Sequence, residues 1–282
     1  MSASAAAAPR PFFLPAAEGQ RFCLYHAAAG DCRGALLYVP PFGEEMHKAR
    51  RMAALQARAL AASGIAVLQL DLHGCGDSAG EFREARWETW RDDVGLGMDW
   101  LAARCGAGAG LWGLRLGALL ALDYAARAAL KPSRLILWQP VHNGAAFLTQ
   151  FLRLRTAGAM LGQQAPAENG TAALRATLRA GQTVEVAGYE LAPPLAAALD
   201  ALELARLAVD DCPLHWFDIA ADAARGVAPA SAAALRDWAA RGVHARHSQL
   251  SGPPFWATQE ISVCPTLLAA TTALFSGAAH AV

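Results

Sequence analysis

Two turns of the sequence, each following a short apolar run, carry residue types that could do chemistry. The run at residues 65–70 leads into Asp71-Leu72-His73-Gly74-Cys75-Gly76-Asp77-Ser78. A second run leads into Gly113-Leu114-Arg115-Leu116-Gly117 and then into a helical pattern. A strand, a Gly-x-Ser-x-Gly turn and a helix together hold a serine nucleophile on a sharp turn. Both glycines of that turn are present, but Arg115 stands where the serine would be.

The arginine removes the usual nucleophile from this position. A guanidinium group stays protonated, with a pKa above about 12, so it acts neither as a nucleophile nor as a general base at neutral pH. An aspartate at this position would permit a dehalogenase-type reaction, and the arginine excludes that reaction as well. Acyl-enzyme chemistry at residue 115 is therefore not expected.

A serine triad also needs an acid and a histidine, and the α/β-hydrolase superfamily, which these two turns resemble, carries them after two later strands. After the predicted strand at residues 214–219, Asp222 fits the acid position and Asp218 is a second choice, although a helix-capping or solvated loop aspartate would look the same. The loop expected to hold the histidine reads Ser251-Gly252-Pro253-Pro254-Phe255-Trp256 and contains none. His244 and His247 come earlier, in the preceding strand. Two of the three triad groups are thus missing.

The remaining groups favour binding of an anion. The helix that begins at Leu116 points its first amides at the turn, and the loop containing Phe42, Gly43, Glu44 and Glu45 is expected to face it. Arg115 adds a planar fork suited to a carboxylate or phosphate. Alternatively, Glu44 or Glu45 already occupies that fork as an internal ion pair. An internal ion pair and anion binding are compatible if ligand entry rearranges the pair. Trp256 is either core or an aromatic wall for a sugar or acyl chain.

Other reactive side chains have simpler explanations. Ser78 or Cys75, with His73 nearby, could be a relocated nucleophile, but the glycines of this turn account for its composition sterically. His47 has no visible partners at metal-ligand spacing. The six cysteines form no Cys-x-x-Cys pair. The sequence therefore indicates no metal, no cofactor and no redox motif.

The elements that would position these residues alternate between strand and helix, which predicts an α/β protein with a mostly parallel sheet. Strands are expected at residues 21–26, 34–39, 65–70, 109–113, 134–138, 214–219 and 243–250. Helices are expected at residues 45–62, 87–103, 116–129, 230–241 and 261–275. The segment at residues 142–207 is too long for a simple connection and predicts an inserted cap. Within it we expect a helix at 145–155, a polar break at 163–170, a short strand at 183–186, a turn at Gly188 and a helix at 194–206. Residues 1–141 and 208–282 then form the core, and the first ten residues are expected to be mobile.

These motifs resemble the α/β-hydrolase superfamily, and in particular the exosortase-A-associated hydrolases of the second type, over nearly the whole chain. The residues that carry the resemblance are Pro40-Pro41-Phe42-Gly43-Glu44-Glu45-Met46 with Arg50-Arg51-Met52, the turns at 71–78 and 113–117, Ala187-Gly188-Tyr189-Glu190-Leu191 and Gly252-Pro253-Pro254-Phe255-Trp256. The resemblance implies an α/β-hydrolase fold and a bacterial exopolysaccharide or protein-sorting context. It does not by itself establish the chemistry.

Composition excludes several other classes of protein. The 282 residues carry 24 basic and 24 acidic side chains, so no excess positive charge favours nucleic acid or an anionic membrane surface. The longest apolar run, at residues 116–122, is too short to span a bilayer, and prolines interrupt the N-terminal segment before a signal peptide could form. A cytoplasmic protein is expected.

Three functions follow from the sequence. The first is a degenerate hydrolase that binds an anionic or glycan-related ligand, or a protein partner, in the old active-site cleft. The second is a genuine hydrolase of an ester, thioester or amide bond that uses a noncanonical catalytic set, for example Ser78 or a water activated by a carboxylate. The third is a structural partner protein whose cleft is filled by side chains.

Overall fold

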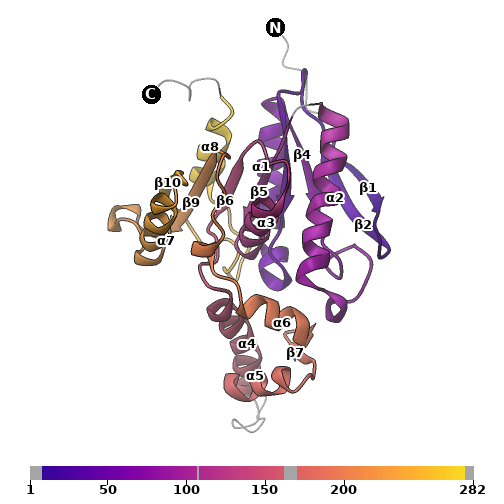
Figure 1. The fold of residues 1–282 in the computed structure, drawn as a ribbon, viewed down its shortest axis with the longest axis vertical. Coiled ribbons are helices and arrows are strands. Elements are labelled where there is room, and N and C mark those ends of the chain that lie inside the picture. The colour runs from indigo at the N-terminus through magenta and orange to yellow at the C-terminus, as the bar shows by residue number, and fades with distance from the viewer. Residues whose placement is uncertain (1–7, 107, 162–169, 277–282) are drawn as a thin grey trace.

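A mixed sheet of eight strands runs through the centre of the protein (Figure 1). The computed structural model describes residues 8–106, 108–161 and 170–276. The strands lie in the order β1-β2-β4-β3-β5-β6-β9-β10. Their bounds are β1 (Arg10–Pro15), β2 (Gln20–His26), β3 (Gly34–Val39), β4 (Ile65–Leu70), β5 (Ala109–Leu114), β6 (Leu135–Trp138), β9 (Leu214–Ala220) and β10 (Ala245–Ser251). β2 pairs antiparallel with both β1 and β4, and all the other pairs are parallel.

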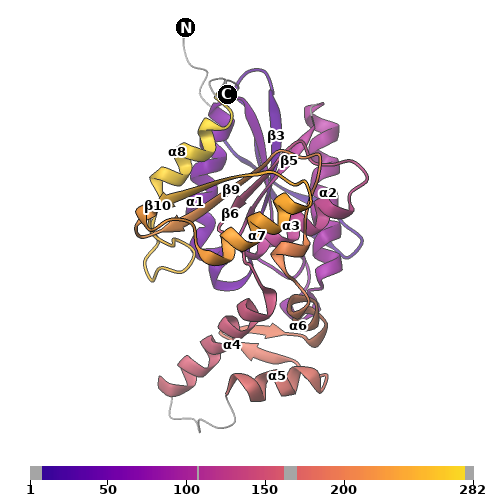
Figure 2. The ribbon, with the colours of Figure 1, turned by 60° about the vertical axis from the view of Figure 1, so that its left-hand side comes forward.

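Helices cover both faces of this sheet, which explains why its central strands are apolar throughout (Figure 2). On one face α1 (Gly43–Ala62) packs against β4 and α8 (Pro265–Ala273). On the other face α2 (Trp87–Cys105) packs against β3 and α3 (Leu116–Arg127), and α7 (Pro229–Ala240) packs against β10. Each face has its own cluster of buried apolar side chains. Strands β3, β4, β5, β6 and β9 run parallel, so the loops that follow them all lie at the carboxyl ends of the strands, on the same side of the sheet.

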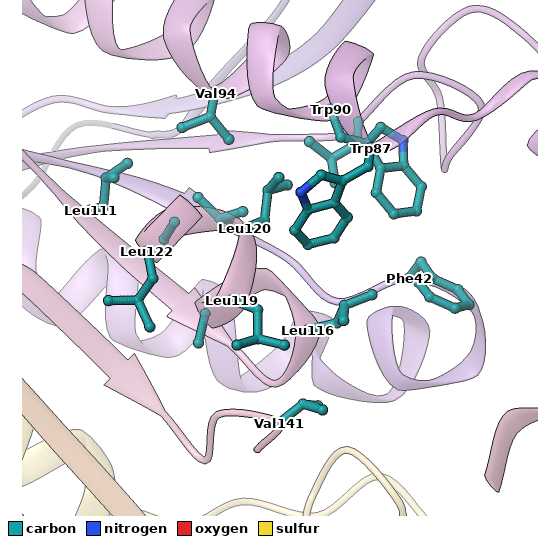
Figure 3. Close-up of a cluster of buried hydrophobic side chains, with 14 of the residues drawn as sticks. Phe42, Trp87, Trp90, Val94, Leu111, Leu116, Leu119, Leu120, Leu122 and Val141 are labelled. Carbon is teal, nitrogen blue, oxygen red and sulfur yellow. The ribbon is translucent and has the colours of Figure 1, made fainter. Parts of the chain in front are cut away.

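The larger apolar cluster supports the turn that contains Arg115. Figure 3 shows side chains of α2, among them Trp87, Trp90 and Val94, meeting leucines of α3 and β5, with Phe42 beside them. Leu116, the first residue of α3, is buried in this cluster. The core therefore packs against the start of α3 and fixes its position.

The segment between β6 and β9 contains α4 (Gly144–Leu161), α5 (Thr171–Arg179), β7 (Val184–Val186), β8 (Tyr189–Leu191), α6 (Pro193–Asp200) and the short 3-10 helix η2 (Leu204–Arg206). It lies at one end of the sheet in both views (Figures 1 and 2). β7 and β8 pair as an antiparallel hairpin. The hairpin contacts the core through Tyr189, whose ring lies 5.5 Å from that of Phe82 in the 3-10 helix η1 (Phe82–Glu84).

The α/β architecture expected from the sequence is confirmed, and each expected core strand and helix is found within a few residues of its predicted bounds. β1, α5 and β8 were not expected. β1 begins at Arg10, inside the segment expected to be mobile, and its prolines are tolerated because it is an edge strand. The helix expected at residues 194–206 ends at Asp200, and α8 begins only at Pro265. Most of the polar break at 163–170 lies outside the described residues.

The described part of the chain contains no helix with both the length and the apolar character needed to cross a bilayer.

Candidate functional site

Arg115 lies at the turn between β5 and α3 with a backbone conformation that L-amino acids rarely adopt. Its φ is 55° and its ψ is −119°. A side chain at Gly113 would overlap Ala118, and a side chain at Gly117 would overlap the carbonyl oxygens of Val39 and Pro40. This turn at residues 113–117, the elbow, therefore touches the loop after β3 at Gly117 and the start of α3 at Gly113, and each close approach requires a glycine. Such a conformation costs about 1–3 kcal/mol and is commonly found at functional sites.

The side chain of Arg115 forms an ion pair with Glu45 in the first turn of α1. Nε of Arg115 donates to Oε1 of Glu45 over 3.1 Å, and the two side chains are 16% and 21% exposed. The guanidinium carbon lies 5.4 Å from the ring centre of Trp256. Burial raises the pKa of Glu45, and the charge of Arg115 opposes this increase. Oε2 of Glu45 is buried and has no hydrogen-bond partner among the described residues.

Glu44, the other candidate partner of Arg115, is exposed and belongs to a different contact. The Glu44 carboxylate lies near the Tyr189 phenol, and burial together with the charge of this carboxylate raises the pKa of Tyr189 to about 12. The expected internal ion pair thus forms through Glu45, while Glu44 lies near the β7–β8 hairpin.

A cavity of about 190 Å³ opens between α1, α4 and the loop after β10. Its apolar wall consists of Phe42, Phe147, Phe151, Leu154, Trp256 and Ala257, and its polar wall of Glu44, Glu45, Lys48 and Gln150. Arg115 does not line this cavity. It is adjacent to the cavity, because it contacts Glu45 and Trp256, which line the wall.

The loop after β3 is in place to face the elbow. Phe42 caps the start of α1, is 3% exposed, and packs against the rings of Phe147 and Phe151 in α4. Gly43 follows with a φ of 62°. A side chain there would touch Tyr189 and Phe151. Convergence of the loop amides with the first amides of α3 on one anion remains a prediction.

The predicted acid position, Asp222, lies away from any histidine contact. It is exposed, and its side chain accepts a hydrogen bond of 2.9 Å from the Ala224 amide at the start of the 3-10 helix η3 (Ala223–Arg225). This is the capping role that the sequence left open as the alternative. Asp218, inside β9, is instead the residue that contacts a histidine: Nε2 of His247 lies 2.9 Å from its Oδ2. His244 precedes β10 and is exposed.

These observations can be set beside known proteins. No protein-family model matches the sequence, and the comparison with curated proteins finds no match. Solved structures do match. Est1E from Butyrivibrio proteoclasticus, with ferulic acid bound, has a TM-score of 0.66 and 15% identity, covering 94% of this chain and 96% of its own. The chain has the α/β-hydrolase fold.

Two further structures have the same likeness. A soluble variant of monoglyceride lipase from Saccharomyces cerevisiae has a TM-score of 0.62 and 13% identity, covering 97% of each chain. A thermostable carboxyl esterase from Bacillus coagulans has a TM-score of 0.62 and 14% identity, covering 96% of this chain and 99% of its own. At these identities the likeness concerns the fold.

A second polar cluster lies beside the elbow of this α/β-hydrolase fold. The sequence pointed to two of its members, Asp218 and His247, but not to their contact or to the other three residues. The cluster consists of His142, Trp216, Asp218, Ser231 and His247. Asp218 accepts from Nε1 of Trp216 over 2.7 Å and from the Ser231 hydroxyl over 2.6 Å, in addition to its contact with His247. Burial raises the pKa of Asp218, but the hydrogen bonds from His247, Ser231 and Trp216 outweigh burial and lower it.

The donors in this cluster can be assigned by elimination. The Ser231 hydroxyl has one proton, which the Asp218 carboxylate accepts, so Nε2 of His142, 3.0 Å away, must donate to Ser231. Nδ1 of His142 is then an acceptor. Burial lowers the pKa of His142; the charge of Asp218 opposes this decrease, and the charge of Arg115 adds to it. His142 and Ser231 are 89 positions apart, and only the position of His142 just after a predicted strand hinted at a role.

The turn after β4 is held together by its own polar groups. The Ser78 hydroxyl donates to the Asp71 carbonyl over 2.5 Å and accepts from the Phe22 amide over 2.9 Å. Cys75 is buried, and burial raises the pKa of its thiol. These contacts leave Ser78 and Cys75 without the exposure and activation that a nucleophile needs.

Within residues 8–106, 108–161 and 170–276, no group of three or more His, Cys, Asp or Glu side chains is arranged to hold a metal ion. His47, the one candidate ligand weighed from the sequence, is exposed on α1.

Proposed function

We propose that this α/β-hydrolase-fold protein is a degenerate hydrolase that binds a small anionic ligand in the former active-site cleft. The observation that carries this proposal is the presence of Arg115 in the strained elbow position, paired with Glu45 at the edge of a cavity. The proposed binding residues are Phe42, Gly43, Glu44, Glu45, Arg115, Leu116 and Trp256. From the resemblance to the exosortase-A-associated hydrolases we propose that this binding belongs to a bacterial exopolysaccharide or protein-sorting context. A cytoplasmic location is likewise a proposal.

The positions of the potential bases support a loss of hydrolysis. Asp222 caps a 3-10 helix, and His247 is bonded to Asp218 inside the sheet. The loop after β10 presents Phe255 and Trp256, both buried, where a triad histidine would be expected. A serine placed at the elbow would therefore have no base delivered by this loop.

The cavity supports a ligand rather than a filled cleft. About 190 Å³ remains open beside the ion pair, under residues 142–207, which we propose as the cap on a core of residues 1–141 and 208–282. Side chains from this segment, Phe147 and Phe151, form one wall. A purely structural partner protein has no need for such an opening, so a protein partner is the less favoured role.

One observation favours a second candidate, a hydrolase of an ester, thioester or amide bond with a noncanonical catalytic set. The His142–Ser231–Asp218 arrangement holds a neutral imidazole next to the elbow with Nδ1 as an acceptor, as a general base for water requires. In that case activity depends on His142 and not on any serine nucleophile.

Serine labelling and ester turnover test the proposal. Purified wild-type protein should not react with a fluorophosphonate probe and should show negligible turnover of short p-nitrophenyl esters. The Arg115→Ser variant should also remain unlabelled, because the loop after β10 supplies no base for the new hydroxyl. Labelling at residue 115 in this variant would instead show that His142 activates the hydroxyl and would favour the second candidate.

Stoichiometric labelling of wild type, or of any serine other than the new one, would refute the proposal. Ester turnover that is lost in His142→Gln and kept in Ser78→Ala would establish the second candidate instead. Turnover lost in Ser78→Ala alone would point to the turn after β4.

A further inference from the structure

We propose that the ligand of this cleft is a small amphipathic carboxylate, with an aryl or short acyl group, and that Glu45 is a built-in competitor which holds Arg115 until the ligand carboxylate replaces it. This inference rests on the proposed binding function and names the ligand class and the residue that gates the site.

The apolar part of the ligand follows from the size and lining of the cavity. Three phenylalanines, Phe42, Phe147 and Phe151, line it together with Leu154 and Trp256. A dry apolar cavity of roughly 150 Å³ accommodates benzene. At about 190 Å³, the cavity thus has room for one aryl ring or a short acyl chain.

The carboxylate group of the proposed ligand follows from the hydrogen-bond donors of Arg115 that have no acceptor in the described part of the chain. Glu45 accepts from Nε alone, and the described residues provide no acceptor for either terminal nitrogen of the guanidinium. A carboxylate that accepts two parallel N–H bonds from one guanidinium binds more strongly than a single contact. Lys48 provides a second positive charge on the cavity wall. A ligand carboxylate in this position would satisfy donors that Glu45 leaves unpaired.

The Arg115–Glu45 ion pair also leaves one carboxylate oxygen of Glu45 without a hydrogen bond from any described residue. Oε2 is buried and unpartnered, which is unfavourable for a carboxylate, and burial raises the pKa of the group. Rotation of Glu45 toward the open cavity and Lys48 would let water reach this oxygen and would uncover Arg115. Arg115 does not line the cavity but contacts Glu45, which does, so a ligand in the cavity reaches the fork most directly by such an exchange.

The same contacts make a sugar a poor fit. Arg115 already covers one face of Trp256, the aromatic side chain that could stack on a sugar ring. Among the lining residues, only Glu44, Glu45, Lys48 and Gln150 carry polar side chains, set against a larger apolar wall. A sugar needs polar partners around most of its edge, whereas an aryl or acyl acid needs them at one end.

The test uses calorimetric titration of the full chain with hexanoate and benzoate, with the neutral hexanamide and benzamide and the cationic hexylamine as comparisons. Wild type should bind the acids and not the amides or the amine. Glu45→Gln should bind the acids about 10-fold more tightly, because the internal competitor loses its charge, and Arg115→Gln should lose about 10-fold or more. Glu44→Gln removes the same charge from the same wall without freeing Arg115, so it should change the affinity much less than Glu45→Gln.

Each other outcome is informative. Equal gains in Glu44→Gln and Glu45→Gln would reduce the effect to net charge and overturn the gating role of Glu45. Amides that bind as tightly as the acids, or an amine that binds in their place, would overturn the ligand class while leaving a binding function intact. If none of the probes binds wild type or Glu45→Gln, the ligand class is wrong. The binding function itself fails if the fluorophosphonate probe labels a serine, a result independent of these titrations. Melting curves of each variant identify any that has not folded.

Discussion

At the scale of single residues, Arg115 combines two costs that a surface arginine would not have. Its backbone has a φ of 55°, and its side chain neutralises a carboxylate that is only 21% exposed. Glycine has no Cβ and reaches this conformation without the same penalty. The ion pair stabilises the folded protein only in so far as it offsets the burial of both charges. Arg115 therefore adds backbone strain and also neutralises the charge of Glu45, and two substitutions can separate these two effects.

Arg115→Gly should be more stable than Arg115→Ala by about 1–3 kcal/mol, since both lose the ion pair and only glycine relieves the backbone strain. Urea unfolding of the two variants measures the difference directly. Adding Glu45→Gln to either variant should recover stability, because it removes the charge left buried and unpaired. Equal stabilities of Arg115→Gly and Arg115→Ala would show that the turn is not strained.

At the scale of elements, the turn from β5 to α3 is fixed by contacts with the end of β3. The space beside Gly117 is filled by the carbonyl oxygens of Val39 and Pro40, so the loop after β3 and the start of α3 touch backbone to backbone. The α4–η2 segment reaches the same region through Phe147 and Phe151, which pack on Phe42. Three elements that are far apart in the sequence thus define one cleft.

Gly117→Ala should destabilise the protein by more than about 2 kcal/mol, because the new methyl group has no space and the backbone must move. Gly170→Ala is the matched control, since nothing lies within 4 Å of its Cβ position, and its effect should stay within about 0.5 kcal/mol. Thermal and urea unfolding of both variants would show the contrast. A neutral Gly117→Ala would mean that the loop after β3 is free to withdraw from the elbow.

At the scale of the whole molecule, burial of histidines in separate parts of the fold links stability to pH. Burial lowers the pKa of His26 and of His142, and burial with the charges of Arg134 and Arg246 lowers that of His215 from 6.5 to about 4. As the pH falls below the ordinary value, the unfolded chain takes up protons that the folded protein does not. The unfolded state then binds more protons, so the free energy of unfolding decreases with falling pH.

Stability should therefore fall from about pH 6.5 downwards, and the contribution of His215 should continue to decrease until about pH 4. His215→Gln should flatten this decrease, because it removes the imidazole whose pKa burial and the two arginines lower. Urea unfolding of wild type and variant between about pH 7.5 and pH 4.5 measures the difference. A His215→Gln variant with the wild-type slope would contradict the role of this imidazole.

The sequence by itself determined the α/β architecture and the chemical character of the elbow. Apolar runs and helical periodicity set by neighbouring residues located the core strands and helices, and the Gly113–Gly117 pair located the turn. That Arg115 is no nucleophile follows from the guanidinium group alone and needs no fold. The sequence could not place β1, because the prolines of an edge strand remove the local signal for pairing.

Only the tertiary structure decided which side chains meet. Glu44 and Glu45 are adjacent in sequence, but successive residues on a helix point about 100° apart, so only the orientation of α1 selects Glu45 for Arg115, 70 positions away. The same holds for Asp218, which pairs with His247 and Ser231 while Asp222 caps a 3-10 helix. Local sequence patterns report which face of an element is buried. They do not report which distant element covers that face, because that is set by the packing of the whole chain.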